Sequence, residues 1–195
     1  TYATFVAKFA EKLNAHALIP DYRLAPEHPF PAGVNDCFTS YQWLLEQGFK
    51  AKNIIIAGDS AGGCLTLTTL IQIRDASLPQ PAAAVLLSPC SDLSFDGFES
   101  MKENADEDPM FVQAALHRMI EAYQPADFDD EVYEDNKLFS PIKDSLAGLA
   151  PIQCHVGSTE MLFYHSTRVI EKANLVGNNG EIHIWKNMPH VHSIF

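Results

Sequence analysis

One serine between two glycines is the residue of this sequence whose type and spacing most clearly indicate chemistry. Ser60 lies in residues 58–63, Gly-Asp-Ser-Ala-Gly-Gly, after an apolar run at residues 54–57 and before a helical pattern at residues 64–75. An apolar strand, Gly-x-Ser-x-Gly and a helix are the context of a nucleophile elbow, a sharp turn that exposes a serine Oγ above a sheet. We therefore predict that Ser60 is a nucleophile.

The neighbours of Ser60 fit the geometry and the charge that such a turn requires. Only small residues let the backbone pass from strand to helix in so little space, which accounts for Gly58 and Gly62. The amide of Ala61, at the N-terminus of the helix, is placed to donate a hydrogen bond to an oxyanion. Because the motif by itself is weak evidence, the alternative is a glycine-rich strand-to-helix turn that binds phosphate.

A serine hydroxyl becomes an effective nucleophile only when a base removes its proton and a carboxylate orients that base. In a parallel sheet, such groups lie on loops beyond the carboxyl ends of the strands. Glu160 follows a predicted strand that ends at Val156, and His190 follows one that ends at Trp185. We therefore expect Ser60, His190 and Glu160 to form a catalytic triad.

Both partners of Ser60 have alternatives. Glu160 can also be read as an acid that only stabilises the start of a helix. His192 competes with His190, but two residues apart on an extended segment they point in opposite directions, and the Met-Pro before His190 favours a turn there. We expect the remaining histidines to be structural or surface residues: His16, His28, His117, His155, His165 and His183. Since there is no H-E-x-x-H or other metal-ligand spacing, we expect no metal site and no zinc hydrolase.

The composition is that of a globular chain, with 195 residues and 47% hydrophobic content, long enough for one domain with a sizeable core. The formal net charge of −12 argues against nucleic acid and anionic membranes as partners. No apolar run approaches the roughly 20 residues that span a bilayer. Because the cysteines form no C-x-x-C pair, we expect reduced thiols in a cytoplasmic protein: Cys37, Cys64, Cys90 and Cys154.

Hydrophobic periodicity predicts an alternation of strands and helices. The expected helices lie at residues 1–13, 32–48, 64–75, 109–123 and 164–176. The expected strands lie at residues 15–19, 53–57, 82–87, 152–156 and 181–185. This alternation implies an α/β fold, with a mostly parallel sheet flanked by helices, in a single domain over residues 1–195.

The stretch from Ser88 to Leu149 interrupts this rhythm. It is long, acidic and irregular, apart from one expected helix with Pro109 in its first turn. Long insertions between strands commonly serve as lids or binding loops. We therefore predict a cap-like or irregular insertion at about residues 91–149.

The last predicted strand, residues 181–185, is expected at an edge of the sheet. Its alternation places Ile182 and Ile184 on one face and His183 and Trp185 on the other. An exposed edge with β-branched residues invites pairing with a second chain. We therefore predict a homodimer joined at or near this strand.

Several stretches of the sequence together match the pattern of a known family. The most specific is residues 21–32, Asp-Tyr-Arg-Leu-Ala-Pro-Glu-His-Pro-Phe-Pro-Ala, followed by the elbow at residues 58–63. The others are Ser-Pro-Cys-Ser-Asp-Leu at 88–93, Val-Gly-Ser-Thr-Glu at 156–160 and Met-Pro-His at 188–190. Over nearly its whole length the chain resembles the hormone-sensitive-lipase-like branch of the α/β-hydrolases, in the version whose triad acid is glutamate.

The resemblance implies a serine carboxylesterase of the α/β-hydrolase fold that hydrolyses short- to medium-chain acyl esters through an acyl-enzyme intermediate, without a cofactor. The order Ser60, Glu160, His190 along the chain is that of the α/β-hydrolase triad. Asp59 then belongs to the elbow signature, and residues 23–27 support the active site from beneath. The alternative is a non-catalytic ligand-binding homologue, similar to the plant gibberellin receptors, which lack the histidine. The presence of His190 favours an enzyme.

The sequence departs from this family in one respect. Members carry a His-Gly-Gly-Gly stretch whose amides supply most of the oxyanion hole, and here it would precede Thr1. The family's strand between residues 15–19 and 53–57, its N-terminal cap and a helix after Phe195 are not in the sequence either. We therefore expect a fragment, truncated at both ends, of a longer enzyme. A fragment that is inactive because it lacks the oxyanion loop is a third interpretation.

Overall fold

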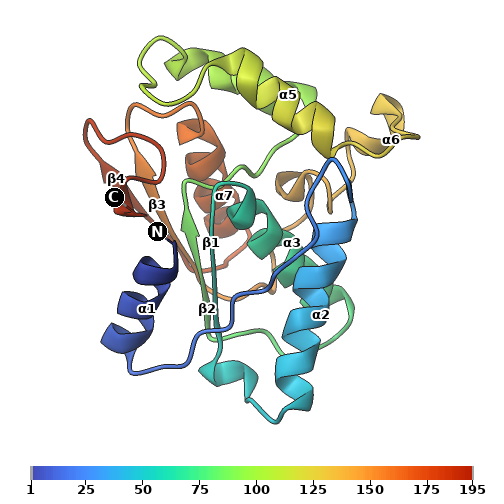
Figure 1. Ribbon diagram of the computed structural model, residues 1–195, viewed down its shortest axis with the longest axis vertical. Helices are drawn as coiled ribbons and strands as arrows, with labels where there is room; N and C mark the ends of the chain where they lie inside the picture. Colours follow the sequence, from blue (N-terminus) through green and yellow to red (C-terminus); the bar gives the residue numbers. More distant parts are fainter. Residues whose placement is uncertain (1, 195) are drawn as a thin grey trace.

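The structure is a computed structural model that describes residues 2–194, apart from the side chains of residues 130 and 131. Within this range the sheet has the strand order β1-β2-β3-β4, and every neighbouring pair is parallel. The strands are β1 (Ile55–Asp59), β2 (Ala83–Leu87), β3 (Ile152–Gly157) and β4 (Gly180–Trp185). Because all of them run in the same direction, their carboxyl ends meet at one edge of the sheet (Figure 1). The predicted α/β fold with a parallel sheet is confirmed.

Helices flank the sheet, some of them before β1 in the chain and the others in the connections between strands. Outside the β2–β3 connection they are α1 (Tyr2–Leu13), α2 (Ala32–Glu46), α3 (Ala61–Asp75) and α7 (Phe163–Leu175). The β2–β3 connection contains α4 (Phe95–Ser100), α5 (Gln113–Tyr123) and α6 (Asp130–Tyr133). Short 3₁₀ turns are η1 (Ala51–Asn53), η2 (Met101–Asn104), η3 (Pro141–Lys143) and η4 (His192–Ile194). Across residues 2–194, no helix is both long and apolar enough to cross a membrane.

The main core lies on one face of the sheet, where apolar side chains of α3 and α7 pack against the strands. Ala84 and Leu86 of β2 are fully buried on this face, whereas Val85 between them is only partly buried. Residues of α1 take no part in this core, and none of them is buried. The strand ends are therefore held in place chiefly by helices on one side of the sheet.

An aromatic cluster fastens the β2–β3 connection to the loop before α2. Phe30 of that loop meets three rings of the connection edge-on, at centroid distances of 5.4 to 5.8 Å: Tyr123, Tyr133 and Phe139. Edge-to-face packing is a favoured geometry for aromatic pairs. Figure 1 shows α5 lying across the end of the sheet at which the strands finish. The assignment of residues 91–149 as a cap-like insertion stays a prediction.

The strand predicted at residues 15–19 is wrong. This segment has no regular secondary structure and belongs to no sheet, and Leu18 and Ile19 are 48% and 61% exposed. A strand requires a neighbour for its backbone hydrogen bonds, and in the described part of the chain β1 pairs only with β2. The apolar residues alone therefore did not identify a strand here.

Two predicted boundaries also shift for local reasons. β1 begins two residues later than expected, because residues 51–53 form the turn η1, which Ile54 closes with a bond from its amide to Ala51 O. Pro109 lies before α5 rather than in its first turn. Asp108 Oδ1 accepts the amides of Met110 and Phe111 at 2.8 and 3.0 Å, and this side-chain turn replaces the first helical turn.

The strand β4 lies at an edge of the sheet, as predicted, since it pairs only with β3 among the described residues. Ile184 and Trp185 at its end are 51% and 45% exposed. The homodimer through this strand stays a prediction.

Candidate active site

Ser60 lies at the junction of β1 and α3 in a conformation that few residues other than glycine adopt. Its φ and ψ are 54° and −118°, so the backbone is strained. Hydrogen bonds to the β2 end hold it there: the Ser60 amide donates to Leu87 O at 2.9 Å, and the Cys90 amide donates to Ser60 O at 3.0 Å. The Ser60 side chain makes no helix-capping hydrogen bond, which leaves the hydroxyl available to a substrate.

The glycines of the elbow have different steric roles. A Cβ at Gly58 would lie 2.1 Å from Gly62 O, and one at Gly63 would lie 2.6 Å from the Pro89 side chain. A Cβ at Gly62 would meet no described atom within 4 Å. The prediction that the turn requires glycine is therefore supported at Gly58, whereas at Gly62 it is wrong, because that position is open and Gly63 is the crowded one.

Ala61 is the first residue of α3 and is exposed. An amide at this position has no acceptor within the helix and lies at the positive end of the helix dipole. Its position directly after Ser60 suits a donor to an oxyanion formed on the Ser60 side chain.

Glu160 and His190 form a buried pair beyond the ends of β3 and β4. Glu160 Oε2 lies 2.7 Å from His190 Nδ1, and the two residues are 0% and 3% exposed. Glu160 Oε1 accepts the amide of Gly157 at 2.6 Å. A Cβ at Gly157 would lie 2.0 Å from Met188 O. Glycine at that position therefore allows the loop that carries His190 to approach the acid loop.

The pairing specifies the role of each imidazole nitrogen. A carboxylate only accepts hydrogen bonds, so Nδ1 of His190 carries the proton and Nε2 is left with a lone pair. Within the described residues, Ser60 Oγ has no hydrogen bond to His190. Such catalytic bonds are commonly long without substrate and tighten in the complex. The Phe111 ring lies edge-on to the imidazole, with centroids 4.9 Å apart.

The competing residues have other environments. The His192 ring lies 5.3 Å from that of Trp185, and its buried Nδ1 has no partner in the part of the chain that the structure describes. Burial lowers the pKa of His192. Asp92, a carboxylate of the motif at residues 88–93, accepts a hydrogen bond from Arg168 Nη1 at 3.0 Å. The acid that bonds His190 is therefore Glu160.

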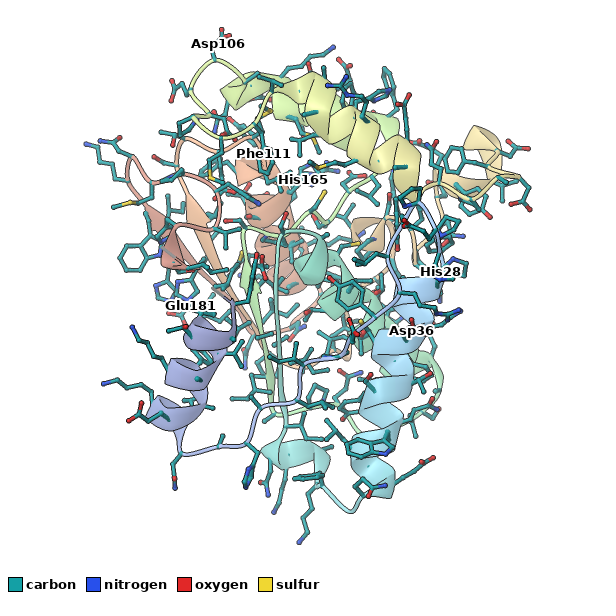
Figure 2. The ribbon with its side chains drawn as sticks, viewed as in Figure 1. His28, Asp36, Asp106, Phe111, His165 and Glu181 are labelled. Carbon is teal, nitrogen blue, oxygen red and sulfur yellow. The ribbon has the colours of Figure 1, made fainter. Side chains whose placement is uncertain are left out.

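The β2–β3 connection is fastened to the loop that carries Glu160. Asn104 Nδ2 donates to the carbonyls of Ser158 and Glu160 at 3.2 and 3.0 Å. Asp108 Oδ2 accepts the amide of Met161 at 2.8 Å. In Figure 2, Phe111 lies beneath α5 on this side of the sheet. These bonds place Phe111 over the imidazole, a role that the sequence reasoning did not assign.

The sequence reasoning also missed Ser88, which bonds to Glu160 and to the loop of His190. Its signal was present, since Ser88 directly follows β2 just as Ser60 follows β1. In the described residues, no group of three or more histidine, cysteine, aspartate or glutamate side chains is arranged to hold a metal ion.

Comparison with known proteins gives this geometry a context. A family model described as alpha/beta hydrolase fold matches residues 1–193. An acetyl-hydrolase from Streptomyces hygroscopicus is 40% identical over 179 residues, which cover 91% of this chain and 58% of that protein. The crystal structure of EstE5 soaked with p-nitrophenyl butyrate is 40% identical with a TM-score of 0.86, covering 95% of this chain and 60% of that one.

A crystal structure of a hormone-sensitive lipase from a metagenome library is 41% identical with a TM-score of 0.80, covering 90% of this chain and 57% of that one. The chain thus spans 57% to 60% of the length of these three proteins. The family match nevertheless extends over almost every residue of the chain itself. The chain belongs to the α/β-hydrolase family, in its hormone-sensitive-lipase-like branch.

Proposed function

We propose that this chain carries the catalytic centre of a serine carboxylesterase, with Ser60 as nucleophile, His190 as general base and Glu160 as the carboxylate that orients it. The observation that supports this best is the buried 2.7 Å contact between Glu160 Oε2 and His190 Nδ1, at the sheet edge where Ser60 follows β1. The substrates are uncharged esters of short- to medium-chain acids. The names of two relatives favour this class, an acetyl-hydrolase and an esterase soaked with p-nitrophenyl butyrate.

In the first half of the reaction, Ser60 Oγ attacks the ester carbonyl carbon while His190 Nε2 takes the hydroxyl proton. The tetrahedral oxyanion accepts a hydrogen bond from the amide of Ala61, and the Glu160 carboxylate stabilises the imidazolium of His190. The bond to the alcohol oxygen then breaks, and the alcohol leaves with the proton that His190 had taken. Ser60 is left as an acyl ester.

In the second half, water attacks the acyl carbon and gives a proton to His190 Nε2. Collapse of the new tetrahedral intermediate releases the carboxylic acid, and the proton returns to Ser60 Oγ. His190 thus acts as base and then as acid in each half. Apart from the ester, the reacting groups are Ser60, His190, Glu160 and water, and an acyl-transfer site uses a second amide beside that of Ala61 to hold the oxyanion.

A non-catalytic ligand-binding role is less well supported. A receptor has no need for a carboxylate that holds an imidazole in one tautomer, whereas a general base does. The strained φ of 54° at Ser60 is of the kind that persists at active sites.

Covalent labelling tests the proposal. A p-nitrophenyl phosphonate should release p-nitrophenol and leave an adduct on the peptide that contains Ser60, and Ser60→Ala should abolish both labelling and hydrolysis of p-nitrophenyl butyrate. Ser91→Ala is the control, because Ser91 is also buried but donates to His165 O at 3.0 Å. Peptide mapping that finds the adduct on another serine would show that the assignment of Ser60 is wrong.

A further inference from the structure

Three of the four strand ends supply the proposed triad, and the fourth supplies a residue with no assigned role. Ser60 follows β1, Glu160 follows β3 and His190 follows β4. The remaining strand, β2, lies between β1 and β3 and is followed directly by Ser88. Ser88 is 1% exposed, so every hydrogen-bonding group that it carries must find its partner inside the protein.

The Ser88 hydroxyl connects the acid to the loop of the base. Its O–H donates to Glu160 Oε1 at 2.8 Å, and its oxygen accepts the amide of Val191, the residue after His190, at 3.0 Å. A hydroxyl offers one donor and two lone pairs, so both bonds form at once. Glu160 Oε2 faces His190 Nδ1. The closed ring of Ser88, Glu160, His190 and Val191 therefore sets the carboxylate and the imidazole relative to each other.

The backbone of Ser88 is held in an unusual conformation that aims the hydroxyl into this ring. Its φ is 51°, a region that residues other than glycine rarely occupy. The Ser88 amide donates to His155 O of β3 at 2.8 Å, which ties the residue to the neighbouring strand. A serine that served only to fill space would not require a strained backbone and two polar partners.

We infer that Ser88 is a positioning residue of the triad: its hydroxyl orients the Glu160 carboxylate toward His190 and fixes the His190 loop through Val191. The inference rests on the proposed function, because it assigns Ser88 a part in that same site. Ser88 acts through Glu160 and does not touch the reacting atoms. Removing its hydroxyl should therefore slow the chemical steps and leave substrate binding nearly unchanged.

Two substitutions separate the hydroxyl from the backbone. Ser88→Ala removes the hydroxyl at a φ that disfavours alanine, whereas Ser88→Gly removes it at a φ that glycine adopts freely. We expect both to lower kcat for p-nitrophenyl butyrate by about 10- to 100-fold, the loss typical of a hydrogen bond to a charged group, with KM within about 3-fold. Because Ser88→Gly relieves the backbone strain, it should remain folded even if Ser88→Ala does not.

A double-mutant cycle distinguishes positioning from a merely structural role. In a Glu160→Gln background the carboxylate that Ser88 orients is gone, so adding Ser88→Gly should lower kcat by less than about 3-fold, since residues that act through one another are not additive. Ser91→Ala is the matched control, a buried serine of the following loop whose hydroxyl bonds to a carbonyl of α7. It should stay within about 2-fold of the wild-type kcat.

The inference is overturned if Ser88→Gly keeps the wild-type kcat, or if its loss in kcat is as large in the Glu160→Gln background as in the wild type. It is also overturned if Ser91→Ala loses as much kcat as Ser88→Gly. An unchanged rate in Ser60→Ala would instead overturn the proposed function. The failure of the triad and the failure of the Ser88 assignment are therefore told apart in the same assay.

Discussion

The two halves of the candidate site are built in opposite ways. On the acid–histidine side, Glu160 and His190 are almost fully buried, and both carboxylate oxygens of Glu160 have hydrogen-bond partners. On the serine side, Ser60 is half-buried, Ala61 is exposed, and β1 forms the edge of the described sheet. The acid–histidine side is thus closed to solvent, and the serine side is open to it.

This difference follows from what each half must do. A buried carboxylate is costly unless its oxygens are hydrogen-bonded, and low dielectric strengthens the bonds that it makes. The acid–histidine side therefore needs a complete set of donors, which Ser88, Gly157 and His190 supply at or beyond the ends of β2, β3 and β4. Under the proposed function the serine side admits an ester: backbone bonds hold the strained conformation of Ser60, no helix-capping bond occupies its hydroxyl, and Ala61 is exposed. We therefore expect a substitution of Glu160 to lower kcat, and a substitution in the turn around Ser60 to lower the free energy of unfolding.

The sharpest test removes the charge from the closed side. Glu160→Gln keeps the shape of the side chain but loses the carboxylate that stabilises the imidazolium, and a comparable change in a serine protease triad costs about 10⁴-fold in kcat. We expect a loss of that order with KM little changed, measured by steady-state hydrolysis of p-nitrophenyl butyrate. Asp92→Asn is the control, because Asp92 is equally buried but bonds to Arg168 and Ser94. Near-normal turnover in Glu160→Gln would show that Glu160 is not the acid on which His190 depends.

The next test concerns the shape of the open side. Gly58→Ala places a Cβ 2.1 Å from Gly62 O and 2.6 Å from Thr66 Oγ1, so the first turn of α3 must move. We expect a loss of about 3 kcal/mol or more in the free energy of unfolding, measured by urea denaturation. Gly62→Ala is the matched variant within the same turn. It meets no described atom within 4 Å, and its stability should stay within about 1 kcal/mol of wild type. Equal losses for the two variants would contradict the steric account.

A structural feature could be predicted from the sequence when its physical cause lies in neighbouring residues or in a general property of parallel sheets. The elbow was predictable because the Gly-x-Ser-x-Gly pattern between a strand and a helix is local in the sequence, although the bonds that hold Ser60 in its strained conformation come from Leu87 and Cys90 at the end of β2. Glu160 and His190 were predictable because a parallel sheet brings strand ends together whatever the intervening sequence. The unpaired segment at residues 15–19 was misread because strand formation depends on a partner elsewhere in the chain. No local pattern contains that information.

The same distinction explains the missed residues. The position of Ser88 after a strand was visible, but its role arises only where the ends of β2, β3 and β4 meet. Pro109 was misplaced because Asp108 caps the amides that a helix start would have used. Gly62 matches the motif, yet the crowding against Pro89 falls on Gly63. Motif and periodicity thus indicated the candidate site residues, and tertiary contacts decided which side chains surround them.

The smallest expected effect concerns pH and the loop that follows Ser88. His165 is 0% exposed; its Nδ1 accepts the amide of Asp92 at 3.3 Å, and its Nε2–H donates to Gly97 O at 3.1 Å. Burial holds the pKa of His165 below its ordinary value, against the Gly97 carbonyl and the Asp92 carboxylate, which raise it, while Arg168 lowers it further. Protonation would also destroy the Nδ1 acceptor. The neutral imidazole therefore ties α7 to the loop on the closed side of the site.

The sign of the pH dependence follows from this lowered pKa. In the unfolded chain His165 is protonated near pH ~6.5, whereas in the folded protein its lowered pKa keeps it neutral to lower pH. The contribution of the neutral imidazole to the free energy of unfolding is therefore complete above about pH 6.5 and is lost as the pH falls. For one proton the free energy of unfolding changes by up to about 1.4 kcal/mol per pH unit. Urea denaturation at about pH 7.5, 6.5 and 5.5 should show this decline.

His165→Gln supplies an amide acceptor and donor without a titrating group, and it should reduce the decline between about pH 6.5 and 5.5. His155 and His192 also have pKa values lowered by burial, so a smaller decline should persist in that variant. His117→Gln is the control, because His117 is exposed on α5 beside Glu121. If His165→Gln and His117→Gln keep the same decline as wild type, the closed side does not depend on a buried neutral imidazole.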